Sequence, residues 1–495
     1  MPLAWLAALG FAVLLAATLR IHGLADRSLW LDEIGQAVVA QASWPDFWNG
    51  IRSHAAAAPL DYLGERIALS MLGPGTAQAR AWAVLCGIAA IPAIAWAAHE
   101  LFKSRTASLV AAFLLAISPF HISYSQEGRF YALSVLVGIL LIGTFSRLVT
   151  RGGLANVLAF SFVSALALHT HYFLAITLLF AGLAIAIVWV VGLREERPSV
   201  LRAGARYLIG VGAAGVMFLP WFVFAASRQA TNSFPGSGPP VPTLENVADL
   251  LVDVISPPAA ANFVTGQPGV LALALIVMAG IGLAAGSPRV RPDILSVGLT
   301  SVGLLPAMWL LVSRANYFLA ARQLILLLPF LFVLAAGGIH FIVGGRSLRG
   351  RRRVRVSPLL AVSGLLLWGA LQIPSVATVK AATWRNNEDW RGVAHYVAEG
   401  LCDGGRVFVN MSRSYAFGFG YYEPGLVTSA HEFRGTPGSV QTLDLGETDW
   451  VAVRTNHYWV GGREGLKQIH DTLVSRGYGA RTFPALMVFA PVQTC

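Results

Sequence analysis

Long apolar stretches alternate with short polar ones over the first 376 residues of the chain. A helix that crosses a bilayer needs about 20 mostly apolar residues. Eleven stretches meet this expectation, although several are short and two are almost continuous: 3–19, 82–98, 106–120, 130–146, 154–170, 172–193, 207–226, 268–286, 294–312, 323–343 and 357–376. Strands of a membrane barrel would instead alternate apolar and polar residues. The pattern predicts an all-α polytopic membrane domain over 1–376, with about 11 transmembrane helices.

The pattern changes after residue 377, where polar and apolar residues are closely mixed. Helices are predicted at 389–400 and 463–475, and strands at 405–410, 449–454 and 482–490. Alternating strands and helices are typical of a compact α/β unit. We therefore expect residues 377–495 to form a small soluble domain.

Composition supports a membrane protein, since 56% of the 495 residues are hydrophobic and only 12% are charged. Soluble proteins carry roughly 25% charged residues, so a soluble enzyme is excluded. The net charge of +11 comes mainly from Arg and Lys in loops on one side of the predicted bundle. Such loops stay in the cytoplasm. This places the N-terminus in the cytoplasm and the C-terminal domain on the periplasmic or extracellular side of the inner (plasma) membrane, with no nucleic-acid partner expected.

The first predicted outer loop, 20–81, contains two notable features. Apolar residues recur at helical spacing from Leu60 to Met71, which predicts an amphipathic helix on the membrane surface. Asp32 and Glu33 are adjacent acids just beyond the first apolar stretch. Either one of them faces a cavity as a general base, or both are acids at the start of an exposed helix.

A second group of polar residues lies between the third and fourth apolar stretches. It contains Glu127, Arg129 and Tyr131. Charge so close to hydrocarbon is costly and often functional. The planar guanidinium of Arg129 suits a phosphate, with Glu127 orienting it, or the two residues form an ordinary interfacial ion pair.

Two more groups fall at predicted outer turns. His169, His171 and Tyr172 belong to the sequence HTHYF. Two His residues are a weak indication of metal, and the alternatives are hydrogen bonding to a polar substrate or an interfacial aromatic turn. Arg322 is the last charge before a long apolar run, so its partner is either a lipid headgroup or a substrate phosphate.

The three cysteines indicate no disulfide-rich scaffold. Cys86 lies in an apolar stretch, where packing explains it. Cys402 and Cys495 both fall in the C-terminal domain. On the oxidising side of the membrane these two either pair or remain thiols.

Five segments together resemble a known family. They are LDE at 31–33, SPFHISYSQEGRFYAL from residue 118, HTHYF, RQLILLLPFLFVLAAGGI from residue 322, and DWRGVAHYV from residue 389. The chain resembles the C-type (GT-C) membrane glycosyltransferases that use polyprenyl-phosphate sugars, such as protein O-mannosyltransferases and the aminoarabinose transferases of lipid A. The resemblance covers nearly the whole chain. It implies a GT-C-like fold with an acidic catalytic residue in the first outer loop.

The resemblance implies an inverting transfer of a sugar, mannose or similar, from a polyprenyl-phosphate donor to a hydroxyl of a glycan, lipid or protein in the cell envelope. Asp32 would be the catalytic base, with Glu33 in the second acidic place. Arg129 and Arg322 would bind the donor phosphate. The substrate-orienting residues would be Glu127, Tyr131, His169, His171 and Tyr172. Some family members use a divalent cation such as Mg or Mn, but the sequence shows no complete ligand set.

Two other functions are compatible with a membrane protein of this composition. A lipid-linked sugar flippase or transporter would place charge near mid-membrane, and the predicted helices carry almost none. An O-antigen ligase-type enzyme would use a diphosphate donor and, as a family, has its long loop late in the chain. Here the acids come first, which favours the monophosphate donor.

Overall fold

The computed structural model describes most of the chain, with gaps between ordered segments. The described residues are 3–54, 57–192, 194–231, 250, 254–255, 274–275, 277–281, 291–315, 319–344, 357–380, 388–410, 418–455 and 460–492. They form two compact units, each discontinuous in sequence. The first comprises Met1–His22, Ser43–Ala68 and Arg80–Lys380, and the second comprises Gly23–Ala42, Leu69–Ala79 and Ala381–Cys495.

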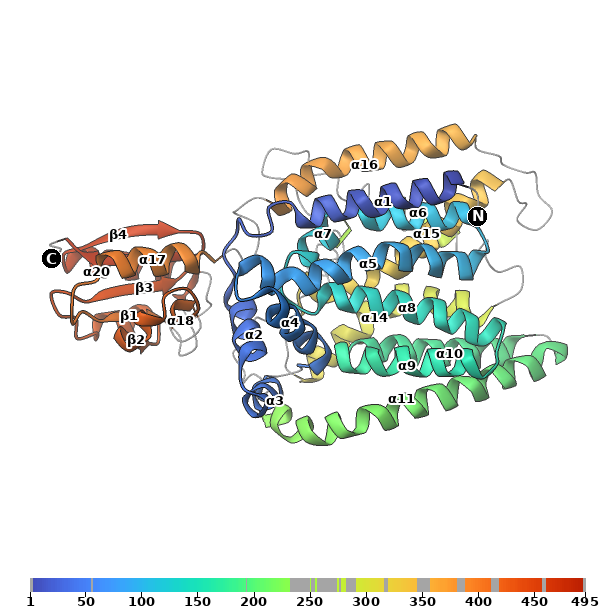
Figure 1. Cartoon of the computed structure of the whole chain (residues 1–495), viewed down its shortest axis with the longest axis horizontal. Helices are drawn as coiled ribbons and strands as arrows, with labels where there is room; N and C mark the ends of the chain where they lie inside the picture. The colour runs from blue at the N-terminus through green and yellow to red at the C-terminus, as the bar shows by residue number, and fades with distance from the viewer. Residues whose placement is uncertain are drawn as a thin grey trace. The chain divides into compact units, whose positions relative to one another are not determined.

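The membrane domain and the first loop are helical throughout their described parts (Figure 1). The helices are α1 (Leu3–Ile21), α2 (Leu31–Gln41), α3 (Trp44–Ser53), α4 (Pro59–Leu72), α5 (Thr76–Phe102), α6 (Arg105–Ala116), α7 (Pro119–Ser125), α8 (Tyr131–Thr150), α9 (Leu154–Thr170), α10 (Leu174–Val191), η1 (Arg194–Glu196), α11 (Arg197–Thr231), α14 (Pro292–Ala315), η2 (Ala321–Leu326), α15 (Leu327–Gly344) and α16 (Pro358–Lys380). Three of them, α2 to α4, lie in the predicted first outer loop.

Among the described residues, eight helical segments are long and apolar enough to cross a bilayer. The pair α6 and α7, bent by 62°, would make a ninth, and α9 is a shorter apolar helix. The predicted span at 268–286 lies mostly outside the described residues. The chain is therefore a multi-pass membrane protein, as expected.

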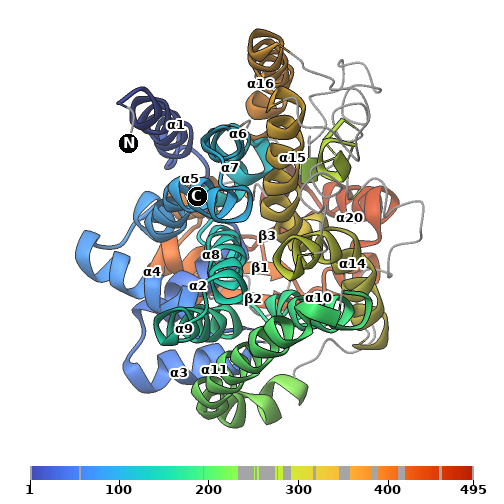
Figure 2. The same ribbon diagram turned by 90° about the vertical axis from the view of Figure 1, so that its right-hand side faces the viewer.

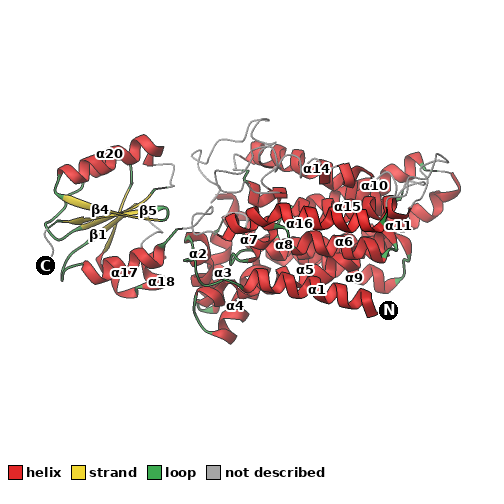
Figure 3. Ribbon diagram, turned by 90° about the horizontal axis from the view of Figure 1, so that it is seen from above, coloured by secondary structure: helices red, strands yellow, loops and turns green. Residues whose placement is uncertain are grey.

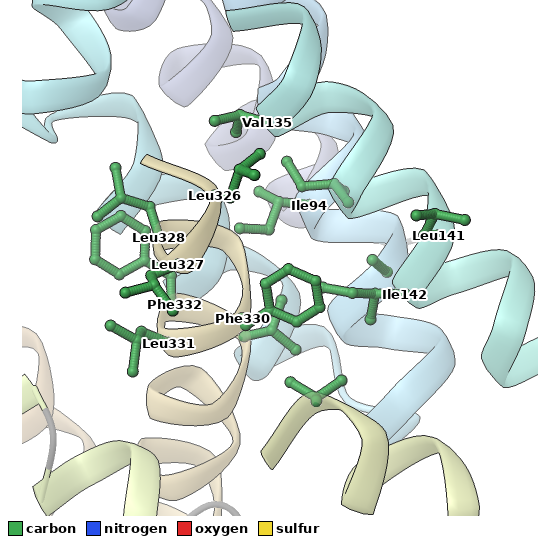
Figure 4. Close-up of a cluster of buried hydrophobic side chains, with 14 of the residues drawn as sticks. Ile94, Val135, Leu141, Ile142, Leu326, Leu327, Leu328, Phe330, Leu331 and Phe332 are labelled. Carbon is green, nitrogen blue, oxygen red and sulfur yellow. The ribbon is translucent and has the colours of Figure 1, made fainter. Parts of the chain in front are cut away.

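The interior of the first unit is built around α8 and α15, each 78% buried over its most apolar window. Figure 2 looks along the helices of this unit and shows both among their neighbours. Buried side chains of α5, α8 and η2–α15 meet in the cluster of Figure 4, which includes Ile94, Val135, Leu326 and Phe330. Lipid tails are as apolar as these side chains, so close packing holds such helices together.

Glycines allow α5 to approach both interior helices closely. A Cβ at Gly143 of α8 would lie 2.2 Å from the Trp96 ring, and one at Gly337 of α15 would lie 2.3 Å from the Phe102 ring. Trp96 and Phe102 both belong to α5. Small residues at these two contacts bring large rings against backbone, which is how helices gain packing energy in a bilayer.

The C-terminal part of the second unit is an α/β domain with one five-stranded sheet of order β2-β1-β3-β5-β4. β1 pairs in parallel with β2 and β3, whereas β5 pairs antiparallel with β3 and β4. The elements are α17 (Trp390–Gly400), β1 (Val407–Asn410), α18 (Gly420–Tyr422), η4 (Pro424–Ser429), β2 (Ala430–Phe433), α19 (Pro437–Gln441), β3 (Trp450–Arg454), α20 (Gly462–Ser475), β4 (Tyr478–Phe483) and β5 (Leu486–Pro491).

Side chains alternate between the two faces of this sheet. Val407 and Val409 of β1 pack in one buried cluster with α17, while Phe408 packs in another with α20. Figure 3 shows α17 and α20 on opposite faces. A period of two along each strand thus supplies two separate cores. The small C-terminal α/β domain predicted from the sequence is confirmed.

Two strands differ from the sequence prediction. The single strand expected at 482–490 is a hairpin, in which Phe483 pairs with Leu486 across a two-residue turn. Ala485 in this turn has φ of 53°, a conformation that Gly or Asn adopts more readily, and Pro-Ala is not one of the usual two-residue hairpin turns. The edge strand β2 was not predicted, because its four residues are too few to show a period.

Candidate functional site

The connection between α7 and α8 lies at one end of the helical bundle. The Gln126 side-chain amide donates to the carbonyl oxygens of Arg20 and His22, each at 2.9 Å. The Lys380 ammonium donates to the same His22 carbonyl at 2.8 Å. The C-terminal ends of α1 and α16 and the α7–α8 connection therefore meet, and we call this the exit end of the bundle. The chain passes from the first unit into the second after His22 and after Lys380, and both of these residues lie at the exit end.

Arg129 lies at the centre of the polar residues at the exit end. Its guanidinium and the Tyr62 hydroxyl form a side-chain hydrogen bond. The Arg129 charge also acts on His171, and the neighbouring Phe130 ring lies 4.5 Å from the His171 ring. Thus the α7–α8 connection, the α9–α10 turn and helix α4 come together around one half-buried cation.

Helix α4 turns its polar side inward. Asp61 and Glu65, one turn apart, are 2% and 1% exposed, whereas Ile67 and Met71 are 57% and 77% exposed. Both carboxylates act electrostatically on Tyr62, which lies between them in the helix. The predicted amphipathic helix is therefore present, and its exposed apolar side is the one suited to lipid.

Burial and charge set the chemistry of two groups near Arg129. Burial raises the pKa of the Tyr62 hydroxyl, and the Arg129 charge and hydrogen bond oppose this rise. Burial and then the Arg129 charge lower the pKa of His171 to about 4. His171 is therefore neutral at pH 7. Its Nδ1 accepts a hydrogen bond from the Phe173 amide at 3.2 Å, so the ring proton is on Nε2, which is a neutral donor.

The other two predicted residues of the α9–α10 turn have protein partners. Tyr172 hydroxyl contacts the carbonyl oxygen of Ala57 and the side-chain oxygen of Gln229, both at 2.9 Å, and accepts from Trp221 Nε1 at 3.1 Å. These contacts fix the turn to the first loop and to α11. His169 Nδ1 donates to the Ala165 carbonyl of its own helix at 2.8 Å, which leaves Nε2 as the ring atom that can reach a ligand.

Glu127 and Tyr131 lie on either side of Arg129 in the sequence, and Arg322 lies in η2. Glu127 is 4% exposed and Tyr131 is 3% exposed, and the Tyr131 ring packs on Tyr124 at 4.8 Å. Arg322 is half-buried in η2, a segment that contacts both α7 and α8. The structure thus places the second predicted phosphate-binding arginine on an element adjacent to the α7–α8 connection.

Asp32 and Glu33 belong to the second unit, in the first turn of α2. Glu33 is fully buried, and its Oε2 accepts from the Trp30 amide at 3.2 Å. Glu33 thereby has the structural role of a cap for the start of α2. Asp32 is half-buried, and the positive end of the helix dipole attracts its carboxylate.

Arg20 is a buried charge that the sequence did not single out. Its side chain is 0% exposed and donates to the carbonyl oxygens of Ala16, Leu115 and Ala116 and to His121 Nδ1. The guanidinium thus binds the C-terminal carbonyls of α6, where a positive charge is favourable. His121 is consequently turned toward Arg20. The only sequence signal was an arginine in the last turn of an apolar helix.

No metal site was found in the described segments. Within them, no group of three or more His, Cys, Asp or Glu side chains could hold an ion.

The cysteines of the two units differ. Cys86 is a free, buried thiol in α5. Cys402 is disulfide-bonded. Cys495, which the sequence suggested as a possible partner of Cys402, lies outside the described residues.

The fold matches solved membrane-protein structures, although no family model and no curated protein sequence matches the chain. ArnT from Cupriavidus metallidurans bound to undecaprenyl phosphate aligns with a TM-score of 0.60 at 12% identity, over 99% of this chain and 98% of that one. Its apo state gives 0.61 at 13%, over 98% of each. AglB, an oligosaccharyltransferase from Archaeoglobus fulgidus, gives 0.52 at 13% in complex with an inhibitory peptide and a dolichol-phosphate, over 99% of this chain and 74% of that one.

Similarity at 12–13% identity establishes the architecture. Both alignments with ArnT cover almost the full length of both proteins. The chain therefore has the fold of ArnT and of AglB, and the fold expected from the sequence resemblance is confirmed.

Proposed function

We propose that this protein transfers a sugar, a hexose such as mannose, from a polyprenyl-phosphate donor to a hydroxyl acceptor at the outer face of the membrane. The observation that supports this most is the Arg129 site. A half-buried guanidinium is held by Tyr62 and lies beside a neutral His171 at the exit end of the bundle. ArnT and AglB, which share the fold, bind undecaprenyl phosphate and dolichol-phosphate in their solved structures.

Arg129 and Arg322 are the proposed ligands of the donor phosphate. A guanidinium can give two parallel hydrogen bonds to phosphate oxygens. The Tyr62 hydrogen bond restricts Arg129 to a limited set of rotamers, so less entropy is lost when phosphate binds. Partial burial strengthens the charge interaction, because water screens it less than at an exposed site.

Asp32 is the proposed general base. Its carboxylate takes the proton of the acceptor hydroxyl while the hydroxyl oxygen attacks the anomeric carbon opposite the phosphate. The bond from the anomeric carbon to the phosphate oxygen breaks, and its electron pair stays on the phosphate. Arg129 and Arg322 stabilise this growing charge. The single displacement inverts the anomeric configuration.

The remaining predicted residues orient these groups. The neutral Nε2–H of His171 donates to a sugar hydroxyl or phosphate oxygen without adding a second cation beside Arg129. Glu127 is the proposed partner that orients Arg129, and a hydrogen bond from the Arg129 amide to the Glu127 carbonyl at 2.7 Å fixes the backbone that carries both residues. His169, Tyr131 and Tyr172 are the other residues proposed to contact the sugar or the acceptor.

The test uses the purified full-length protein in nanodiscs with polyprenyl-phosphate mannose and a cell-envelope extract as acceptor. Release of polyprenyl phosphate is measured for wild type, Asp32→Asn and Asp46→Asn. General-base catalysis contributes about 10²–10⁴-fold, so Asp32→Asn should lose that much of kcat. Asp46 is the matched control, because it is an exposed acid in the first turn of the neighbouring α3.

Three outcomes would contradict the proposal. Near wild-type kcat in Asp32→Asn would exclude this residue as the base. In a parallel assay in vesicles, movement of the donor across the bilayer without cleavage would indicate a flippase. When a diphosphate-linked sugar is supplied beside the monophosphate donor, consumption of the diphosphate alone would indicate a ligase-type enzyme.

A further inference from the structure

The segment that precedes Asp32 is fastened to the C-terminal domain by polar contacts within the second unit. The Tyr422 hydroxyl accepts from the Leu29 amide at 2.8 Å. The Ser28 hydroxyl accepts from the Arg391 amide at 3.1 Å. The Arg391 guanidinium donates to the carbonyl oxygens of Ala25 and Asp26 at 3.2 and 2.9 Å. Residues 25–29 are therefore bound by backbone and side-chain groups far away in the sequence.

Glu388 contacts the residue that immediately precedes Asp32. Its Oε2 accepts from the Leu31 amide at 3.2 Å and from the Trp390 indole at 2.8 Å. Its Oε1 accepts from Arg454 Nε at 2.7 Å and forms an ion pair with the same guanidinium. Glu388 is 0% exposed. One buried carboxylate thus joins the first turn of α2, the start of α17 and the end of β3.

The Leu31 amide needs an acceptor from outside its own helix. Leu31 is the first residue of α2, and amides of the first turn have no intrahelical partner. The N-cap residue, Trp30, forms no side-chain cap hydrogen bond. Glu33 accepts from the Trp30 amide, and Glu388 accepts from the next one. The turn that carries Asp32 is therefore capped partly from within and partly from the C-terminal domain.

Arg454 is itself rigidly held. Asn410, at the end of β1, accepts from the Arg454 amide at 2.6 Å and donates to the Arg454 carbonyl at 3.3 Å. β1 and β3 are neighbours in the middle of the sheet. A continuous series of contacts therefore runs from two central strands through Arg454 and Glu388 to the Leu31 backbone.

We propose that Glu388 is a positioning residue for Asp32, and that the C-terminal domain contributes to catalysis by holding the turn that carries the base. This inference rests on the proposed function of Asp32. Glu388 acts through the Leu31 amide, one residue before Asp32. A displacement of about 1 Å in a catalytic group can cost on the order of 10²-fold in rate, so this anchor would affect kcat more than donor binding.

The test compares Glu388→Ala and Glu388→Gln with Asp449→Ala in the full-length protein. Asp449 is the matched control, because it is 3% exposed and pairs with Arg406 at the opposite ends of the same two strands. Two readouts are measured: kcat and KM for polyprenyl-phosphate mannose, and hydrogen–deuterium exchange of the peptide that covers residues 28–36.

We expect Glu388→Ala to lower kcat by about 10²-fold, with KM changed less than threefold and faster exchange in residues 28–36. Glu388→Gln keeps an acceptor oxygen for Leu31 and should recover part of both effects. Asp449→Ala should lower thermal stability while leaving kcat and this exchange close to wild type.

The inference fails if folded Glu388→Ala retains kcat, whether or not exchange increases. It also fails if Asp449→Ala loses as much kcat as Glu388→Ala, because the effect would then be general destabilisation. Asp32→Asn is measured in parallel. If Asp32→Asn is active while Glu388→Ala is not, the assignment of the base is wrong and Glu388 acts on something else. If Asp32→Asn is inactive and Glu388→Ala is active, only the positioning role is wrong.

Discussion

The surroundings of His171 in the fold set the pKa of its imidazole, although the residue itself was already selected from the sequence. The HTHYF turn indicated polar chemistry, but not the protonation state. Burial and Arg129 lower the pKa of His171 to about 4, while an unperturbed His titrates near 6.5. Neither the burial nor the arginine could be inferred from the turn itself.

This lowered pKa predicts a specific dependence of stability on pH. Between pH 6.5 and pH 4 the unfolded chain binds a proton at this position and the folded protein does not. Stability therefore falls as the pH is lowered through that interval, by roughly 3 kcal/mol if His171 is considered alone. The measurement is the thermal unfolding midpoint from pH 4 to pH 7, for wild type and His171→Gln.

We expect His171→Gln to show a weaker loss of stability on acidification than wild type, because glutamine does not take up this proton. His169→Gln, in the same turn, controls for the loss of an imidazole ring from this part of the protein. An unchanged slope in His171→Gln would show that the imidazole is already protonated, or exposed, in the folded protein.

The sequence alone identifies Arg129 as a candidate but does not identify the residues that contact it. Arg129 could be selected because a charge beside hydrocarbon is costly. Its partner Tyr62 could not be selected, because Tyr62 lies in α4 and Arg129 in the α7–α8 connection, far apart in the sequence. Arg20 was overlooked for the same reason, since its acceptors are the carbonyl oxygens of another helix.

At the scale of elements, periodicity predicted α4 and its lipid-facing apolar side, but not the burial of its acidic residues. Its apolar residues were expected to face the membrane surface, and Ile67 and Met71 are indeed exposed. The burial of Asp61 and Glu65 depends on how closely α4 approaches its neighbour. That approach is set by Gly64, where a Cβ would lie 2.1 Å from the Trp82 ring of α5.

Gly64→Ala should therefore destabilise the protein, although Gly→Ala inside an open helix position is normally favourable. Overpacking costs typically 1–3 kcal/mol, and the Tyr62–Arg129 contact should weaken as α4 moves. The thermal midpoint and the KM for the donor measure the two effects. Trp82→Ala in the same chain should restore part of the stability.

Gly10→Ala is the matched control for this glycine, because no atom lies within 4 Å of its added Cβ. It should be neutral or slightly stabilising. A Gly64→Ala variant as stable as Gly10→Ala would show that α4 and α5 are not in tight contact at Gly64.

At the scale of the whole molecule, the discontinuity of the two units was not predictable from the sequence. The sequence placed a boundary at 376/377, and the second unit resumes at Ala381, after α16. It also includes Gly23–Ala42 and Leu69–Ala79 from the first loop. Composition marks where a chain becomes polar, but the contacts of Glu388 and Tyr422 with residues 28–31 connect segments more than 350 residues apart.

The predicted topology of the membrane domain has a direct test. Positively charged loops stay in the cytoplasm, so the loop at η1 should be internal and α20 of the C-terminal domain should be external. Glu195 and Lys467 are exposed positions in these two elements. In intact spheroplasts, a membrane-impermeant maleimide should label Lys467→Cys and should label Glu195→Cys only after permeabilisation. Native Cys86 is buried, so the wild-type chain gives the background. The reverse labelling pattern would place the exit end of the bundle, with Arg129, on the cytoplasmic side, where the proposed transfer at the outer face could not occur.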